Sequence, residues 1–287
     1  MTSTGTRGKS ATPLSPPGWA GVGTCALREI RPMPPWRPPF HALVLATAGH
    51  GTMEVDFDPK VCRPGTLLWV RPGQALRLGS NGLAASVVTF DGRLAGDHWP
   101  DQPESPSRWQ LEGEDEDAVI SEFAQLAVDC ERHRSGPLAA DLLRHQLTVL
   151  LLRIALLTRS PAVHGAEART FARFRRRLES GHPRSRRVED YAEEMGCSVR
   201  TLTRASLTVT GRTAKQVVDD RVALEARRLL ACTPMSVAEV GRHLGFPEPT
   251  NFGRFFHREV GRSPGQFRAD IGLNHHGVVP EQRRPPD

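Results

Sequence analysis

Short apolar runs separated by Gly, Pro, Asn and Asp fill the segment from Cys25 to about Asp91. This pattern is typical of β-strands joined by tight turns. The predicted strands are His41–Ala46, Thr52–Phe57, Thr66–Val70, Ala75–Leu78 and Ala84–Phe90. Strict alternation at Met53, Val55 and Phe57 makes the second of them a half-buried strand. Regularly spaced short strands of this kind predict an antiparallel sandwich or barrel.

Helical spacing replaces this pattern after a Pro- and acid-rich stretch at 99–117. Ala118–Arg132 and Leu138–Thr158 are the predicted helices. In the second helix, apolar residues recur at alternating steps of four and three, at Leu143, Leu147, Leu150, Ile154 and Leu157. Such a heptad seam joins two copies of a chain in a coiled coil, and the same spacing also suits a helix packed on its own domain. Both interpretations remain open from the pattern alone.

From Glu167 to about Asp270 the pattern is helical, and two segments within it share one layout. Each segment, Val188–Arg204 and Ser236–Arg254, has a short amphipathic helix, a glycine, and a second helix with arginines on its outer face. This is the layout of a helix–turn–helix unit, which presents its second helix to the DNA major groove. Two units in one chain predict that it reads two stretches of groove.

The second unit has the clearer local signals. Ser236 and Glu239 have the spacing of a capping box, which satisfies free amides at a helix start. Gly245 is placed at the turn, where a positive φ favours glycine, and Pro249 suits the first turn of the next helix. The residues expected to be buried are Val237, Val240, Leu244, Phe252, Phe255 and Phe256.

The first unit follows the same scheme with a turn one residue shorter. Tyr191, Ala192 and Met195 are expected to face inward, and Ser198 to cap the second helix. Between the two units, Thr213–Ala231 predicts a continuous spacer helix. Nineteen residues at about 1.5 Å each give roughly 28 Å, close to the ~34 Å that separates successive major-groove faces.

Charge supports an anionic partner for this region. The whole chain of 287 residues carries a formal charge of +6, whereas Glu167–Arg268 has 20 Arg and Lys against 12 Asp and Glu, or +8. The remainder therefore sums to −2. Arginine on a recognition helix binds guanine or phosphate, and threonine does either more weakly.

Other functions have less support. The five cysteines are scattered without a Cys-x-x-Cys pair, which indicates free thiols rather than a disulfide framework or a zinc site. No secretory signal and no membrane-spanning run is found, so a cytoplasmic protein without membrane contact is expected. A metal-dependent enzyme of the barrel needs clustered His and carboxylates, and His41 and His50 stand apart. No cofactor, metal site or catalytic residue is therefore predicted.

At this point the helical region resembles the DNA-binding domain of the AraC/XylS family of bacterial transcription regulators. The stretches that carry the resemblance are Arg221–Leu230, Ser236–Val240, Leu244–Phe246, Asn251–Phe256 and Gly261–Arg268. The family pattern has a buried Phe and then a basic residue where this chain has Ser206 and Leu207, a common aromatic at Asn251, and a common Ala at Gly241. The resemblance implies two recognition helices in adjacent major grooves and control of transcription initiation.

By position, the resemblance and the caps assign DNA binding to Ser198, Val199, Arg200, Thr201, Thr203, Arg204, Glu248, Pro249, Thr250, Gly253 and Arg254. The front half resembles the cupin-like sensor domain of the same family, on Phe40–Ala46, Gly49–Phe57 and Cys62–Pro72. This implies a jelly-roll barrel with a small-molecule pocket, followed by dimerising helices. His41, His50, Trp69 and Arg71 are candidate effector-binding residues, each of which also suits an ordinary barrel or surface position.

The sequence thus predicts an α+β multidomain chain with a cupin-like β-barrel, dimerising helices and a C-terminal all-α domain. Its expected parts are a disordered 1–20, a sensor and dimerisation domain at 21–159, a linker at 160–166, a DNA-binding domain at 167–270 and a disordered 271–287. Promoter DNA, a small-molecule effector and a second copy bound through Ala139–Leu157 are the expected partners, with RNA polymerase a further candidate. Two alternatives remain, a cupin-type enzyme with an accessory helical domain and a protein-interaction module. Activation and repression are not distinguished.

Overall fold

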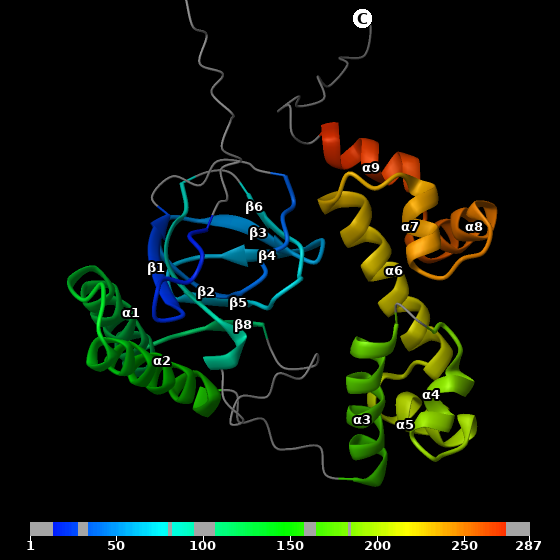
Figure 1. The fold of residues 1–287 in the computed structure, drawn as a ribbon, viewed down its shortest axis with the longest axis horizontal. Helices are drawn as coiled ribbons and strands as arrows, with labels where there is room; N and C mark the ends of the chain where they lie inside the picture. The colour runs from blue at the N-terminus through cyan, green and yellow to red at the C-terminus, as the bar shows by residue number, and fades with distance from the viewer. Residues whose placement is uncertain are drawn as a thin grey trace, which may run out of the picture.

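The computed structural model describes residues 14–27, 34–79, 82–94, 107–157, 165–182 and 185–273, in a strand-rich N-terminal domain and a helical C-terminal domain (Figure 1). The expected α+β class with two unlike domains is confirmed. The expected linker lies mostly outside the described residues, and so does nearly all of the expected C-terminal tail.

Two antiparallel sheets build the N-terminal domain. The five-stranded sheet has the order β1-β7-β2-β5-β8, with bounds Val22–Leu27, Ala84–Phe90, His41–Ala48, Thr66–Val70 and Arg108–Gln110. The three-stranded sheet has the order β4-β3-β6, with bounds Asp58–Cys62, Gly51–Val55 and Leu76–Leu78. A short 3₁₀ turn covers Gly92–Leu94. The sandwich or barrel predicted from the short strands is confirmed in this form.

Strand β2 is buried on both faces, which explains its unbroken apolar run. Ala42, Val44 and Ala46 belong to the core between the sheets. Leu43 and Leu45 belong to a second core on the outer face of the five-stranded sheet. A strand covered on both sides loses the alternation that marks a half-buried strand.

The second core is closed by α1 (Glu114–Arg132) and α2 (Pro137–Leu157), which lie on the side of the barrel away from the helical domain (Figure 1). Most of the predicted heptad seam of α2 is buried there, with Leu147, Leu150 and Ile154 against the sheet and Leu143 in a small cluster beside it. The seam is therefore a core stripe, as the second interpretation of the spacing allowed.

The segment expected to be disordered at 1–20 reaches further into the fold than predicted. Leu14 is fully buried in the core between the sheets, and Ala20 packs beside α2. Small and Pro-rich flanks hide these anchors from a reading of composition. Residues 1–13 lie outside the described part of the chain.

A hairpin also differs from the prediction. Asp58 and Pro59, which follow the predicted strand Thr52–Phe57, begin a further strand, β4, which pairs with β3. The turn itself is Asp56–Phe57, with φ of 56° and 66°. Phe57 therefore leaves the alternation of Met53 and Val55, and it packs on the helical domain instead.

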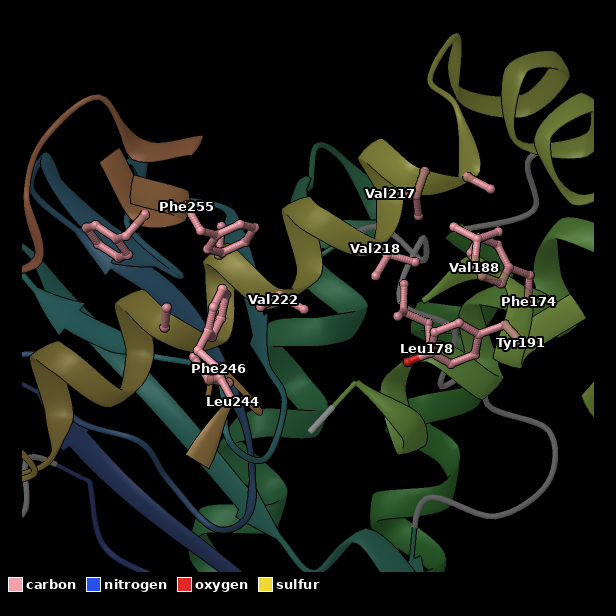
Figure 2. Close-up of a cluster of buried hydrophobic side chains, with 14 of the residues drawn as sticks. Phe174, Leu178, Val188, Tyr191, Val217, Val218, Val222, Leu244, Phe246 and Phe255 are labelled. Carbon is pink, nitrogen blue, oxygen red and sulfur yellow. The ribbon is translucent and has the colours of Figure 1, made fainter. Parts of the chain in front are cut away.

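The C-terminal domain contains seven described helices around one core. Their bounds are α3 Ala166–Gly181, α4 Val188–Glu194, α5 Val199–Thr210, α6 Ala214–Cys232, α7 Val237–His243, α8 Pro249–Val260 and α9 Pro264–Leu273. The predicted spacer is confirmed as α6, which begins at a Thr213 capping box. Figure 2 shows Val217 and Val218 of α6 beside the first unit, and Leu244 and Phe246 at the other end of the cluster.

Candidate nucleic-acid interface

Helices α4 and α5 form the first helix–turn–helix unit. Tyr191, Ala192 and Met195 are buried as predicted. Gly196 has φ +63° at the turn, a conformation that is strained for residues with a Cβ. Ser198 then caps α5, because its Oγ accepts a hydrogen bond from the Thr201 amide at 3.1 Å. These local interactions place the first turn of α5 at the surface.

Helices α7 and α8 form the second unit, with both bonds of the predicted capping box. The Glu239 amide donates to Ser236 Oγ at 3.2 Å, and the Ser236 amide donates to Glu239 Oε2 at 2.7 Å. Gly245 has φ +74°. Pro249 opens α8, as predicted. The link from α4 to α5 is one residue shorter than the link from α7 to α8, also as predicted.

All eleven residues predicted to bind DNA lie on α5, α8 or their N-caps, and none is buried. Thr201, Thr203 and Gly253 are half-buried, and the other eight are exposed. The opposite sides of the two helices carry the core residues Leu202, Phe252 and Phe256. The outer faces of α5 and α8 are therefore accessible to a large partner.

The charged groups on these faces differ in how they are held. Arg204 Nε lies 3.5 Å from Glu167 Oε1 of α3, whereas Arg200 and Arg254 have no ion pair within the described residues. Glu248 makes no side-chain capping bond, so its carboxylate is also available. Arg200 and Arg254 can therefore reach an anionic partner without breaking an existing contact.

One residue that the sequence analysis missed connects the two units directly. Arg186, just before α4, donates from Nη2 to the Gly245 carbonyl at 2.9 Å. Its guanidinium also lies 3.7 Å from the centroid of the Phe246 ring. Both partners belong to the turn of the second unit. The distance along the chain hides this pairing from any local pattern.

The first unit contains a packing defect at the position where the family pattern has a Phe. Ser206 is fully buried in α5, and its Oγ has no hydrogen-bond partner within the described residues. A buried hydroxyl without a partner loses its hydrogen bonds to water and forms none in the protein, which lowers the stability of the fold. The helix nevertheless forms, because Leu202 and Ala205 fill the adjacent core.

The barrel contacts the DNA-binding domain through the Asp56–Phe57 turn. Asp56 accepts two hydrogen bonds from Arg228 of α6, both 2.7 Å long. Phe57 lies edge-on to Phe267 of α9, with the ring centroids 5.5 Å apart, and under the guanidinium of Arg227. Burial alone would raise the pKa of Asp56, but the Arg228 guanidinium holds it below the usual value.

A second contact joins the domains nearby. Arg37, before β2, donates to Glu225 Oε1 of α6 at 2.8 Å. Burial would raise the pKa of Glu225, but Arg37, Arg221 and Arg228 together lower it to about 2. The carboxylate is therefore charged at neutral pH, and this ion pair persists across the physiological range.

Three of the four candidate effector residues contact one another in a row, His41 with Trp69 and Trp69 with Arg71, and His50 lies apart from them. His41 is buried, accepts a 3.0 Å hydrogen bond from Trp69 Nε1 and stacks on Phe90. His50 is exposed at the β2–β3 turn. Arg71 lies over the Trp69 ring and lines a cleft between the two domains.

Neither a metal site nor a membrane-spanning helix is found in the described part of the chain. Among the residues that the structure describes, no group of three or more His, Cys, Asp and Glu side chains is arranged to hold a metal ion. In the same part of the chain, no helix combines the length and apolar character needed to cross a bilayer.

Two family models match the chain in consecutive segments. The AraC-like ligand binding domain matches residues 29–148, and a helix-turn-helix domain matches residues 191–270. The second match spans both helix–turn–helix units and the α6 spacer, and together with the first match it defines a ligand-sensing transcription regulator. The chain belongs to the AraC family of such regulators.

Curated relatives agree with this assignment. RhaR of Enterobacter sp. (strain 638), an HTH-type transcriptional activator, is 31% identical over 150 residues, which cover 52% of each chain. The chain thus spans about half the length of RhaR. RhaS of the same organism, also an HTH-type transcriptional activator, is 26% identical over 242 residues, 80% of this chain and 85% of RhaS. ToxT from Vibrio cholerae O395 is 11% identical over 90% of this chain and 99% of its own, with a TM-score of 0.46.

Proposed function

We propose that this protein activates transcription by binding promoter DNA with α5 and α8, under the control of a small-molecule effector. The observation that carries the proposal is the pair of exposed recognition helices, held apart by α6, in a segment, Glu167–Arg268, of charge +8. Activation rather than repression rests on RhaR and RhaS, both named as activators. Such a regulator acts in the cytoplasm, where promoter DNA and RNA polymerase are found.

Both units contribute to base readout and to phosphate binding. Arg200 and Arg254 lie on the outer faces without an ion-pair partner in the described residues, so they supply the main positive contacts. Arg204 exchanges Glu167 for a phosphate or a base. Thr201, Thr203 and Thr250 hydrogen-bond the DNA with shorter side chains than the arginines. The surface that faces the groove is completed by Ser198, Val199, Glu248, Pro249 and Gly253.

Binding-site selection followed by footprinting tests the proposal. The expected result is one selected sequence with protection of two adjacent major grooves on one DNA face. Arg200→Gln is expected to weaken binding by about 1–3 kcal/mol if it reads guanine, and to flatten the salt dependence by about one phosphate contact if it does not. Arg132→Gln removes an exposed charge at the end of α1 and serves as the matched control.

Two results would replace this function with one of the alternatives. Uniform DNA affinity without any selected sequence would remove the regulator and favour a protein-interaction module for the helical domain. A stoichiometric transition metal in the purified protein, together with turnover of a substrate, would favour an enzyme. The first outcome is read from selection, and the second from elemental analysis.

We also propose that the protein is a homodimer through α2, with the contact on a face that the heptad prediction did not use. Apolar side chains between 40% and 84% exposed follow the outer face at Leu138, Leu142, Val149, Leu152 and Leu156. With His145 between them, they recur in steps of four and three, which is the spacing of a coiled-coil seam. A second copy of the same helix is the partner that this spacing fits.

A further inference from the structure

Among the residues that the structure describes, the cleft between the barrel and the helical domain is lined by more arginines than carboxylates. It has a volume of about 780 Å³, within the range of small-molecule sites. Its lining includes seven arginines and four carboxylates. Residues of β5–β6, α3 and α6 all contribute, so a molecule in the cleft contacts both domains.

Every described carboxylate in the lining is already paired. Asp56 binds Arg228, and Glu225 lies within ion-pair distance of Arg37, Arg221 and Arg228. Glu179 pairs with Arg221 at 2.7 Å, and Asp220 with Arg212 at 2.9 Å. These acids are therefore not free to neutralise further arginines.

Two arginines of α3 form no ion pair in the described part of the chain. Arg175 and Arg176 line the cleft and make no ion pair within the described residues. Arg175 is half-buried beside the Phe171 ring, and its Nε has no hydrogen-bond partner in the described part of the chain. Burying a guanidinium N–H without an acceptor costs free energy, and an oxyanion in the cleft would supply that acceptor.

Arg71 faces the same cleft from the barrel. Its guanidinium is stacked on the Trp69 ring, 4.7 Å from the centroid, and Trp69 is fully buried and bonded to His41. The stacking fixes the plane of the guanidinium, and planar guanidinium groups bind carboxylate and phosphate in a bidentate manner. Arginines of both domains thus line the cleft.

We propose that this cleft binds a small organic anion, held through its carboxylate or phosphate oxygens by Arg175 and Arg176 of α3 and by Arg71 of the barrel. The effector class is therefore anionic, and its site lies between the domains. Because the anion contacts both domains, binding stabilises the arrangement in which the Asp56–Phe57 turn rests on α6. The link from this site to promoter control rests on the proposed function, whereas anion binding itself does not.

Calorimetric titration of the full chain without DNA tests the site, with citrate as the carboxylate probe and pyrophosphate as the phosphate probe. Sodium chloride at matched ionic strength corrects for general screening. We expect saturable binding of at least one probe, weakened tenfold or more in Arg175→Gln/Arg176→Gln. The control pair Arg200→Gln/Arg204→Gln, on the outer face of α5, should bind the same probe as the wild type does.

The two probes distinguish the ligand class, and the two variants distinguish the site. Stronger binding of citrate assigns a carboxylate ligand, and stronger binding of pyrophosphate assigns a phosphate ligand. Absence of saturable binding by both probes overturns the proposal, and so does binding that survives in the α3 variant but falls in the α5 variant, because that places the anion on the DNA face. Circular dichroism confirms that each variant is folded. Footprinting on the same samples reports the proposed function separately.

Discussion

Single residues change the stability of each helix–turn–helix unit, and Ser206 is expected to lower the stability of the first unit. Its hydroxyl is fully buried in α5 without a partner in the described residues. Ser206→Ala removes the unsatisfied group and raises helix propensity, so the free energy of unfolding should increase by about 1 kcal/mol. Chemical denaturation measures it. A loss of stability would mean that the hydroxyl has an unseen partner, such as an ordered water.

The turn glycine of the second unit allows a test of backbone conformation, because there is room for a Cβ at this position. Gly245 has φ +74°, and a Cβ built there would meet no atom within 4 Å. Gly245→Val therefore tests mainly backbone strain, and it should cost about 2 kcal/mol. Gly245→Asn is the matched control, because Asn tolerates the left-handed region. Thermal unfolding of both variants compares them, and equal losses would contradict a conformational cause.

At the level of elements, local signals were enough to predict the units but not their connection. Capping residues, turn glycines and the α6 spacer are encoded within a few positions of where they act, so the sequence predicted them. Arg186 contacts a turn about sixty positions away, and no periodicity marks it. The α2 helix shows a second limit of prediction from sequence. It has apolar residues on two faces, and spacing alone cannot tell which face meets the sheet.

The Arg186 contact predicts a specific defect in DNA recognition. Arg186→Gln removes a hydrogen bond and a cation–π contact, together about 1 kcal/mol, or roughly fivefold in affinity. Because the contact joins the two units, the loss should be largest on DNA with the selected spacing and smaller on DNA lengthened by one base pair. Fluorescence anisotropy on both DNAs measures this.

The neighbouring Arg187 gives the matched control. It is exposed, and its nearest acid is Glu189, 3.7 Å away within the same unit. Arg187→Gln should change affinity for both DNAs by the same factor. An equal loss on both DNAs for Arg186→Gln would show that Arg186 acts as an ordinary phosphate contact and not as a link between the units.

At the scale of the whole molecule, the Asp56–Phe57 turn joins the barrel to the helical domain. Asp56→Asn keeps a residue that tolerates positive φ but removes the charge from a buried ion pair, which should weaken the domain contact by roughly 3 kcal/mol. Amide exchange in α6 should then accelerate around Arg227 and Arg228. Asp58→Asn, whose partner is Lys60 within strand β4, is the control. Unchanged exchange in both variants would mean that the turn does not hold α6.

The proposed dimer places the outer face of α2 in the contact between two copies of the chain. Leu142 and Leu152 are 40% and 45% exposed, on the side of the helix away from the sheet. Leu142→Glu/Leu152→Glu therefore places two charges in the proposed seam without entering the core, and a charge buried without a partner is strongly unfavourable. Sedimentation velocity should show a dimer for the wild type and a monomer for the variant across micromolar concentrations.

The control for this experiment is Val61→Glu, an equally apolar and more exposed position on strand β4. It should leave the dimer intact, because β4 belongs to the other sheet. If the α2 variant remains a dimer, the contact lies elsewhere, and if the wild type is monomeric at every concentration, α2 has no self-association. A monomeric variant should also lose affinity for promoters that carry two binding sites, while keeping its affinity for a single site, because only the effective concentration of the second domain is lost.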